Sequence, residues 1–206
     1  MTNGDFIRSM TDEDITENFT PGICELIKHR DPERCQDREH CFHCVKGEDW
    51  KEYINKTCLE VTCGEAPFLT SRYDTTTGQM IAVPDRIGLL DKKLNVLAEQ
   101  FHDYDMWMCW AINAYASTYG YEWQGDNFLL ARCNLFLTLI ENFMYRFDAE
   151  KLEIGFMPIF LDCIADTISW NVWQMDGLKK TVPGTGIPCK IKDWKADKEI
   201  LFKDVM

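Results

Sequence analysis

Short β-prone runs alternate with longer helical segments in the last three quarters of the chain, and this alternation is its most restrictive feature. The β-prone runs are residues 59–62, 120–123, 170–173 and 187–194, of which 170–173 also fits a helix end. The helical segments are residues 86–100, 104–119, 128–146 and 157–168. Strands separated by helices predict an α/β domain with a doubly wound, mostly parallel sheet.

The helical segment at residues 128–146 has the strongest apolar pattern. Apolar side chains recur along it at helical spacing, which predicts that they face the core. The positions expected to be buried are Leu129, Cys133, Phe136, Leu137, Ile140 and Met144.

Length and charge limit the protein classes. A chain of 206 residues suits one main domain, and we divide it into a helical, cysteine-rich segment at 1–58 and an α/β part at 59–206. No apolar run approaches the ~20 residues needed to span a bilayer, and the first ten residues lack the pattern of a signal peptide, so we expect a cytoplasmic protein.

The net charge of −12 argues against direct DNA binding by this chain alone. Such acidity usually keeps a surface solvated, and the alternative is a surface that imitates DNA.

Cysteines are concentrated in the first third of the chain, and without an export signal we expect reduced thiols. The spacing Cys41-x2-Cys44 occurs in structural zinc sites, so this segment is a candidate for holding a zinc ion. Either His40 or His43 is able to replace one thiol, and unligated thiols are the alternative. The candidate ligands are Cys24, Cys35, Cys41 and Cys44.

The stretch Leu59-Glu60-Val61-Thr62-Cys63-Gly64-Glu65-Ala66-Pro67 follows the pattern of a strand and a tight glycine loop. It resembles the cofactor loop, of the type Asp-Pro-x-Cys-Gly-x-Gly, in the N6-adenine DNA methyltransferases of restriction-modification systems. Glu60 replaces the usual Asp, Val61 the Pro and Ala66 the second Gly. The resemblance implies an S-adenosylmethionine site that includes Glu60, Thr62, Cys63 and Gly64. A glycine there lets the backbone approach the ligand closely.

Three more segments stand in the order of this family. Phe19-Thr20-Pro21 is similar to the segment that lines the methionine end of the pocket. Tyr119-Gly120-Tyr121-Glu122 ends in an acid, Glu122, at the point where the family's acid accepts the ribose hydroxyls. The stretch from Trp170 to Leu178 resembles the segment that touches the adenine amino group, with Asp176 as its candidate. The resemblance implies that residues 59–206 form the cofactor-binding part of a Rossmann-like methyltransferase.

The family's catalytic tetrapeptide Asn-Pro-Pro-Tyr is absent from the sequence. That loop positions the target amino group and stacks on the flipped base, so we expect no methyl transfer by these residues alone. The first hypothesis is therefore a cofactor-binding fragment or subunit that needs a second chain for the catalytic loop.

Two other functions compete with this one. The first is a non-enzymatic acidic protein of a mobile element, which inhibits a restriction system or another nucleic-acid-directed defence as a decoy subunit or DNA mimic. Such a protein would bind a defence nuclease or methylase. The second is an enzyme with Cys63 as nucleophile, which the sequence disfavours because it places no histidine beside this thiol.

Overall fold

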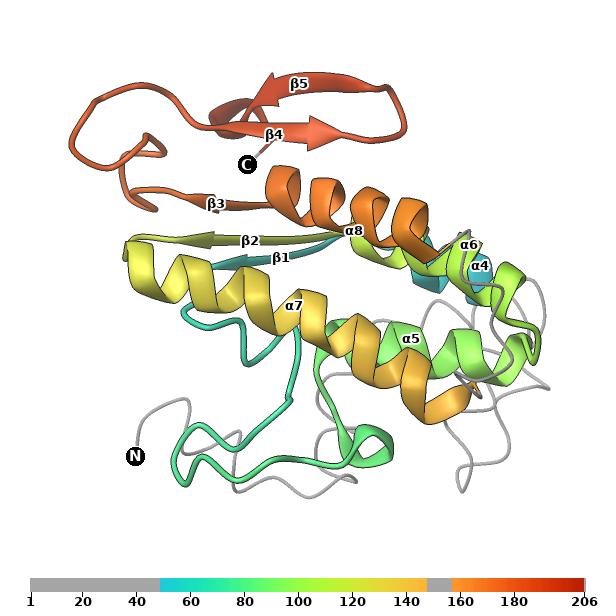
Figure 1. Ribbon diagram of the computed structural model, residues 1–206. Helices are drawn as coiled ribbons and strands as arrows, with labels where there is room; N and C mark the ends of the chain where they lie inside the picture. The colour runs from blue at the N-terminus through green and yellow to red at the C-terminus, as the bar shows by residue number, and fades with distance from the viewer. Residues whose placement is uncertain (1–48, 148–156, 206) are drawn as a thin grey trace, which may run out of the picture. The chain divides into compact units, whose positions relative to one another are not determined.

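The structure is a computed structural model that describes residues 49–147 and 157–205. The chain separates into two compact units, Met1–Lys51 and Glu52–Met206, and nearly all of the described residues belong to the second unit. The described residues form five α-helices and five strands, drawn in Figure 1. The helices are α4 (Asp49–Asn55), α5 (Leu89–Gln100), α6 (Tyr104–Ala116), α7 (Gly125–Arg146) and α8 (Met157–Asn171). The strands are β1 (Cys58–Val61), β2 (Thr118–Glu122), β3 (Val172–Gln174), β4 (Lys190–Asp193) and β5 (Lys198–Leu201).

Strands β1, β2 and β3 form a three-stranded parallel sheet with β2 in the centre. The register pairs Glu60 with Gly120 across β1 and β2, and Glu122 with Gln174 across β2 and β3. Every residue of β2 is buried, as expected for the central strand of a parallel sheet that is covered on both faces. The prediction of an α/β fold with a parallel sheet is confirmed at this level.

The boundary between α6 and β2 differs from the sequence prediction, which extended the helix to Tyr119. The helix ends at Ala116, and its last carbonyls accept hydrogen bonds from two hydroxyls that follow it. Ser117 Oγ donates to Asn113 O at 2.9 Å, and Thr118 Oγ1 donates to Ala114 O at 2.8 Å. These bonds satisfy carbonyls at the end of a helix, so the chain turns directly into β2.

The two faces of the parallel sheet have different covers in the described part of the chain. Helix α7 packs along β2 and β3 on one face, and a hairpin of β4 and β5 lies on the other (Figure 1). Tyr119 and Tyr121 point from β2 toward the hairpin, where their hydroxyls donate to Lys192 O and Lys190 O. Residues of this layer form one apolar cluster: Tyr119, Tyr121, Met175, Cys189, Ile191 and Phe202.

The structure differs from the prediction for residues 187–194 in the sheet to which their strand belongs. A strand does form there, and its neighbour Cys189 and its residue Ile191 are buried. The strand is not part of the parallel sheet, because β4 pairs with β5 in an antiparallel arrangement. The second face is therefore covered by a hairpin where a doubly wound fold has helices.

Helix α7 buries a different face from the one that the apolar pattern predicted. Leu129, Leu137 and Met144 are 60%, 40% and 64% exposed, and Cys133 is exposed as well. The buried residues are Ala131, Asn134, Leu135, Thr138, Leu139, Asn142 and Phe143. Buried polar groups are tolerated when they are hydrogen-bonded. Asn134 accepts a bond from Arg72, the Thr138 hydroxyl bonds to that of Thr70, and Asn142 donates to Thr138 O.

Candidate functional site

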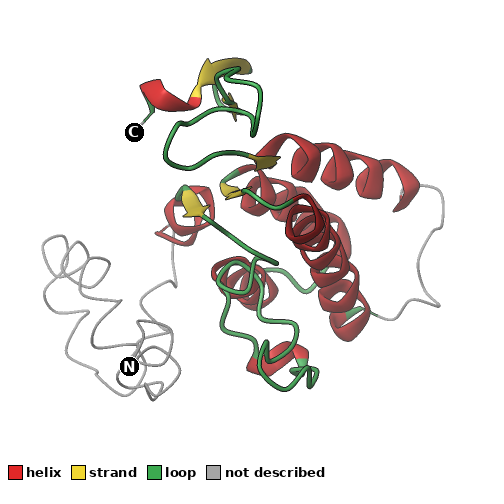
Figure 2. Cartoon of the chain, turned by 90° about the vertical axis from the view of Figure 1, so that its left-hand side faces the viewer, coloured by secondary structure: helices red, strands yellow, loops and turns green. Residues whose placement is uncertain are grey.

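The predicted site residues that the structure describes lie at or beside the carboxyl edge of the parallel sheet. Because β1, β2 and β3 run in the same direction, the loops that follow them emerge at this edge, toward which Figure 2 is viewed. The amide of Gly64, in the loop after β1, donates to Glu122 Oε2 at 2.7 Å. The segment after β3 joins them, since Met175 N donates to Glu122 O at 2.7 Å. A Cβ atom on Gly177 would lie 3.1 Å from Val61 Cγ1.

Glu122 is held rigidly at the centre of this edge. It is the last residue of β2 and is 5% exposed. In addition to the bond from Gly64, its Oε1 accepts a hydrogen bond from Gln124 N at 3.0 Å. Each carboxylate oxygen has two lone-pair sites, so one site on each oxygen has no hydrogen-bond partner among the described residues.

Glu60 brings a second carboxyl group to the same side of the sheet. Its register partner is Gly120, two residues before Glu122, so the side chains of Glu60 and Glu122 leave the sheet on one face. Glu60 Oε2 is buried and has no hydrogen-bond partner within residues 49–147 and 157–205. Burial, followed by the charge of Glu122, raises the pKa of Glu60 to about 8. At neutral pH this carboxyl is therefore mainly protonated and able to donate a hydrogen bond.

Glycines give the loop after β1 its close fit to β2. Gly64 has a φ of 56°, a left-handed conformation that glycine adopts without strain, and its missing side chain would point into open space. At Gly120 the need is different, because a Cβ there would lie 3.0 Å from Cys63 Sγ. The glycine in β2 thus allows Cys63 to pack directly onto the strand.

Cys63 is a core residue of this loop. Its side chain is 1% exposed, and its amide extends the sheet by donating to Tyr121 O at 2.9 Å. Burial, with smaller contributions from the charges of Glu60 and Glu122, raises the pKa of Cys63 to about 12. A thiol in this state is a poor nucleophile, which argues against the hypothesis of a cysteine-dependent enzyme.

Asp176 lies in the segment after β3, where its carboxylate organises a turn. Its Oδ1 accepts hydrogen bonds from Leu178 N at 3.1 Å and Lys179 N at 3.0 Å. The bond from the Lys179 amide is the main reason that the pKa of Asp176 lies below its usual value. Lys179 Nζ lies 3.6 Å from Oδ2 and completes the surroundings of the carboxylate.

Several predicted site residues lie outside the described part of the chain. They are Phe19, Thr20 and Pro21 of the proposed pocket and the candidate zinc ligands Cys24, Cys35, Cys41 and Cys44. The zinc site therefore stays a prediction. Residues 49–147 and 157–205 contain no group of three or more His, Cys, Asp or Glu side chains arranged to hold a metal ion, and their six cysteines are unpaired.

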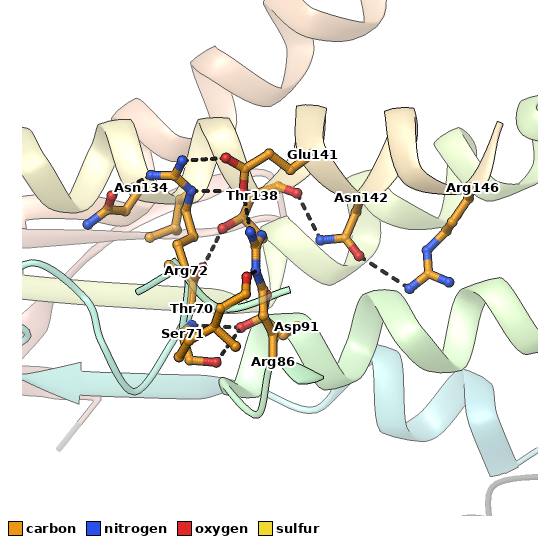
Figure 3. A network of polar contacts seen from close by, with 12 residues as sticks. Thr70, Ser71, Arg72, Arg86, Asp91, Asn134, Thr138, Glu141, Asn142 and Arg146 are labelled. Atoms are coloured by element: carbon orange, nitrogen blue, oxygen red, sulfur yellow. Dashed lines mark hydrogen bonds and ion pairs between the residues drawn. The ribbon is translucent and has the colours of Figure 1, made fainter. Parts of the chain in front are cut away.

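A polar network next to the site was not predicted from the sequence (Figure 3). It joins α7 to the loop between β1 and α5 through Asn134 and Glu141. Arg72 Nε donates to Glu141 Oε2 at 3.0 Å, and Arg86 Nη2 lies 2.6 Å from the same oxygen. Polar residues at 134, 138, 141 and 142 have helical spacing, and this stripe was the available signal in the sequence.

Comparison with known proteins found no match among protein-family models, curated proteins or solved structures. In the part of the chain that the structure describes, no helix has both the length and the apolar character required to span a membrane.

Proposed function

We propose that this chain is an S-adenosylmethionine-binding fragment or subunit related to the N6-adenine DNA methyltransferases of restriction-modification systems. The observation that supports the proposal most is the hydrogen bond from Gly64 N to Glu122 Oε2. It joins the glycine loop and the terminal acid of the next strand at the carboxyl edge of a parallel sheet. In open α/β sheets this edge is where nucleotide-like ligands bind. In the proposal, the sheet is the cofactor half of a Rossmann-like methyltransferase.

The backbone at Ala66 adds support that the sequence alone did not give. Ala66 stands where the family's loop has its second glycine. Its φ is 65°, a left-handed value that few residues other than glycine adopt, and the residue is fully buried. The loop therefore has, at Ala66, a backbone conformation that is typical of glycine.

The side chains at the edge suit the parts of this ligand. The free lone-pair sites of Glu122 would accept the two ribose hydroxyls. Protonated Glu60 would donate a hydrogen bond to an acceptor on the ligand, which would also give its buried Oε2 a polar neighbour. The loop around Gly64 would lie against the methionine part, and the segment of Asp176 near the adenine.

Methyl transfer by these residues alone is not part of the proposal. The sequence contains no Asn-Pro-Pro-Tyr, the family's loop that positions the target amino group and stacks on the flipped base. The catalytic loop would come from additional polypeptide.

Isothermal titration calorimetry with S-adenosylmethionine tests the proposal. We expect micromolar binding by the full chain and at least a tenfold loss of affinity in Glu122→Gln, which keeps the size of the side chain but removes its charge. Glu199→Gln in the hairpin is the matched control and should bind like the wild type. If a correctly folded wild-type chain does not bind, the proposal is wrong and the non-enzymatic acidic interaction protein becomes the better hypothesis.

A further inference from the structure

We infer that Asn134 of α7 is a positioning residue for the glycine turn, by which we mean residues 62–66. Asn134 does not reach Glu122 or Glu60 itself. It acts on the turn from the opposite side, through the main chain of Glu65. This inference rests on the proposed function for its biological meaning, although its structural part can be tested without any ligand.

Asn134 donates hydrogen bonds toward the glycine turn and accepts one from Arg72. Its Nδ2 donates to Glu65 O at 2.9 Å and to Tyr73 Oη at 3.0 Å, and its Oδ1 accepts from Arg72 Nη1 at 3.0 Å. The side chain is 6% exposed, so these bonds replace water almost completely. Because Arg72 donates only, it fixes the amide oxygen toward itself and the amide nitrogen toward Glu65.

Glu65 is consequently held by both its main chain and its side chain. Tyr73 Oη donates to Glu65 Oε2 while it accepts from Asn134, so the three residues form a closed ring of hydrogen bonds. Glu65 follows Gly64, whose amide donates to Glu122. The glycine turn is therefore fixed from β2 on one side and from α7 on the other.

The far end of the network supplies the rigidity that a positioning role requires. Glu141, two turns along α7, accepts hydrogen bonds from both Nε and Nη2 of Arg72. Glu141 also pairs with Arg86, which is 4% exposed and donates through Nε to Ile81 O at 3.1 Å. Hydrogen-bond networks of this kind restrict side chains to few arrangements, although Nη1 of Arg86 is buried without a partner among the described residues.

Amide hydrogen exchange at Gly64, measured by NMR on the full chain without ligand, tests the inference directly. Asn134→Ala removes the bonds to Glu65 and Tyr73, and we expect the protection of the Gly64 amide to fall about tenfold relative to the wild type. The matched control is Asn142→Ala, which is the same change at another buried position of α7. Asn142 bonds to Thr138 O and Arg146, away from the glycine turn.

A second measurement connects this effect to ligand binding. S-adenosylmethionine should bind Asn134→Ala at least tenfold more weakly than Asn142→Ala, at a similar loss of melting temperature. Equal exchange at Gly64 in the two variants would overturn the inference. If the wild type does not bind the ligand, the proposed function fails, and the exchange result alone decides the role of Asn134.

Tyr73→Phe provides an independent variant in case Asn134→Ala does not fold. It removes only the hydroxyl that joins Glu65 to Asn134, at a partly exposed position. Faster exchange at Gly64, with little change in melting temperature, would support the inference. Unchanged exchange in a folded Tyr73→Phe variant would contradict it.

Discussion

The backbone amide of Gly64 donates a hydrogen bond of 2.7 Å to the carboxylate of Glu122, 58 residues further along the chain. The bond ties the loop after β1 to the end of β2. An amide–carboxylate bond is charge-assisted and therefore stronger than most bonds between neutral groups. Both residues would have to move together if the edge of the sheet were to rearrange.

Replacing Gly64 with alanine should have two separable effects. The left-handed φ of 56° strains any side chain, so we expect a loss of about 1 kcal/mol in unfolding free energy. The new methyl group would point into open space beside Glu122, where we expect it to weaken S-adenosylmethionine binding. Gly78→Ala is the control, with a φ of 71° and equally open surroundings in a turn. It should cost similar stability and leave binding unchanged, and equal binding by the two variants would contradict the prediction.

The buried carboxyl of Glu60 should make stability depend on pH. Its pKa rises from 4.5 to about 8 in the folded state, because burial and the charge of Glu122 disfavour ionisation. Between these values the folded protein holds a proton that the unfolded chain has lost, so the unfolding free energy should fall as pH rises from about 5 to 8. Glu60→Gln imitates the protonated form and should remove this decline. Urea unfolding of both proteins at several pH values measures the unfolding free energy. If it fell equally with pH in the wild type and in Glu60→Gln, the prediction would be contradicted.

Glu141 should be worth much more to stability than a surface carboxylate. It pairs with Arg72 and Arg86, which are 9% and 4% exposed, so Glu141→Gln removes the ion-pair partner that two nearly buried charges share. Breaking such a buried pair typically costs about 3–5 kcal/mol. Glu199→Gln, which breaks the exposed pair with Lys190 in the hairpin, should cost at most about 1 kcal/mol. Similar losses in chemical denaturation would show that the network does not stabilise the fold as described.

Lys93 should produce a pH dependence of opposite sign. This residue of α5 is 1% exposed, and its Nζ donates to Lys56 O and Ser117 Oγ at the amino edge of the sheet. Burial lowers its pKa from 10.5 to about 8, so between these values the unfolded chain holds the extra proton. The unfolding free energy should therefore rise with pH over this range, relative to Lys93→Met. If the difference in unfolding free energy between the wild type and Lys93→Met stayed constant from pH 8 to 10, the lowered pKa of Lys93 would be contradicted.

Cysteine labelling should distinguish Cys63 from the exposed thiols. With its side chain 1% exposed and its pKa raised to about 12, Cys63 has almost no reactive thiolate at pH 8. Cys109, Cys133 and Cys163 are exposed and should react with iodoacetamide under native conditions. Mass spectrometry of tryptic peptides gives the order of labelling. Early modification of Cys63 in the folded protein would revive the hypothesis of a reactive cysteine.

The strands at the site were predictable because their signals are local. Leu59 to Cys63 combines β-prone residues with a following glycine, and Glu122 follows a similar run; both patterns come from backbone preference and alternation alone. Once the strands are taken as parallel, the proximity of Gly64 and Glu122 follows from the geometry of the sheet. The sequence pattern predicts only that the two residues are close, and the hydrogen bond between them is known from the structure alone.

The buried face of α7 and the place of β4 were not predictable in the same way. Leu129, Leu137 and Met144 suggested an apolar core face, yet the structure buries Asn134 and Asn142 and leaves these three exposed. Burial of this polar stripe depends on partners that are distant in sequence, since Arg72 bonds to Asn134 and Thr70 bonds to Thr138. A local periodicity contains no information about such partners. The pairing of β4 with β5 likewise depends on contacts with the tyrosines of β2.

The hairpin of β4 and β5 determines how far the chain can be shortened. The ring of Phe202 packs edge-on against Tyr121 with ring centroids 4.6 Å apart, and Ile191 completes the cover of the sheet. A recombinant version that stopped after Thr181 would retain all three parallel strands but leave both tyrosine rings of the middle one facing water. The hairpin residues up to Phe202 are therefore part of the folding unit, and expression of a piece without them should yield aggregates.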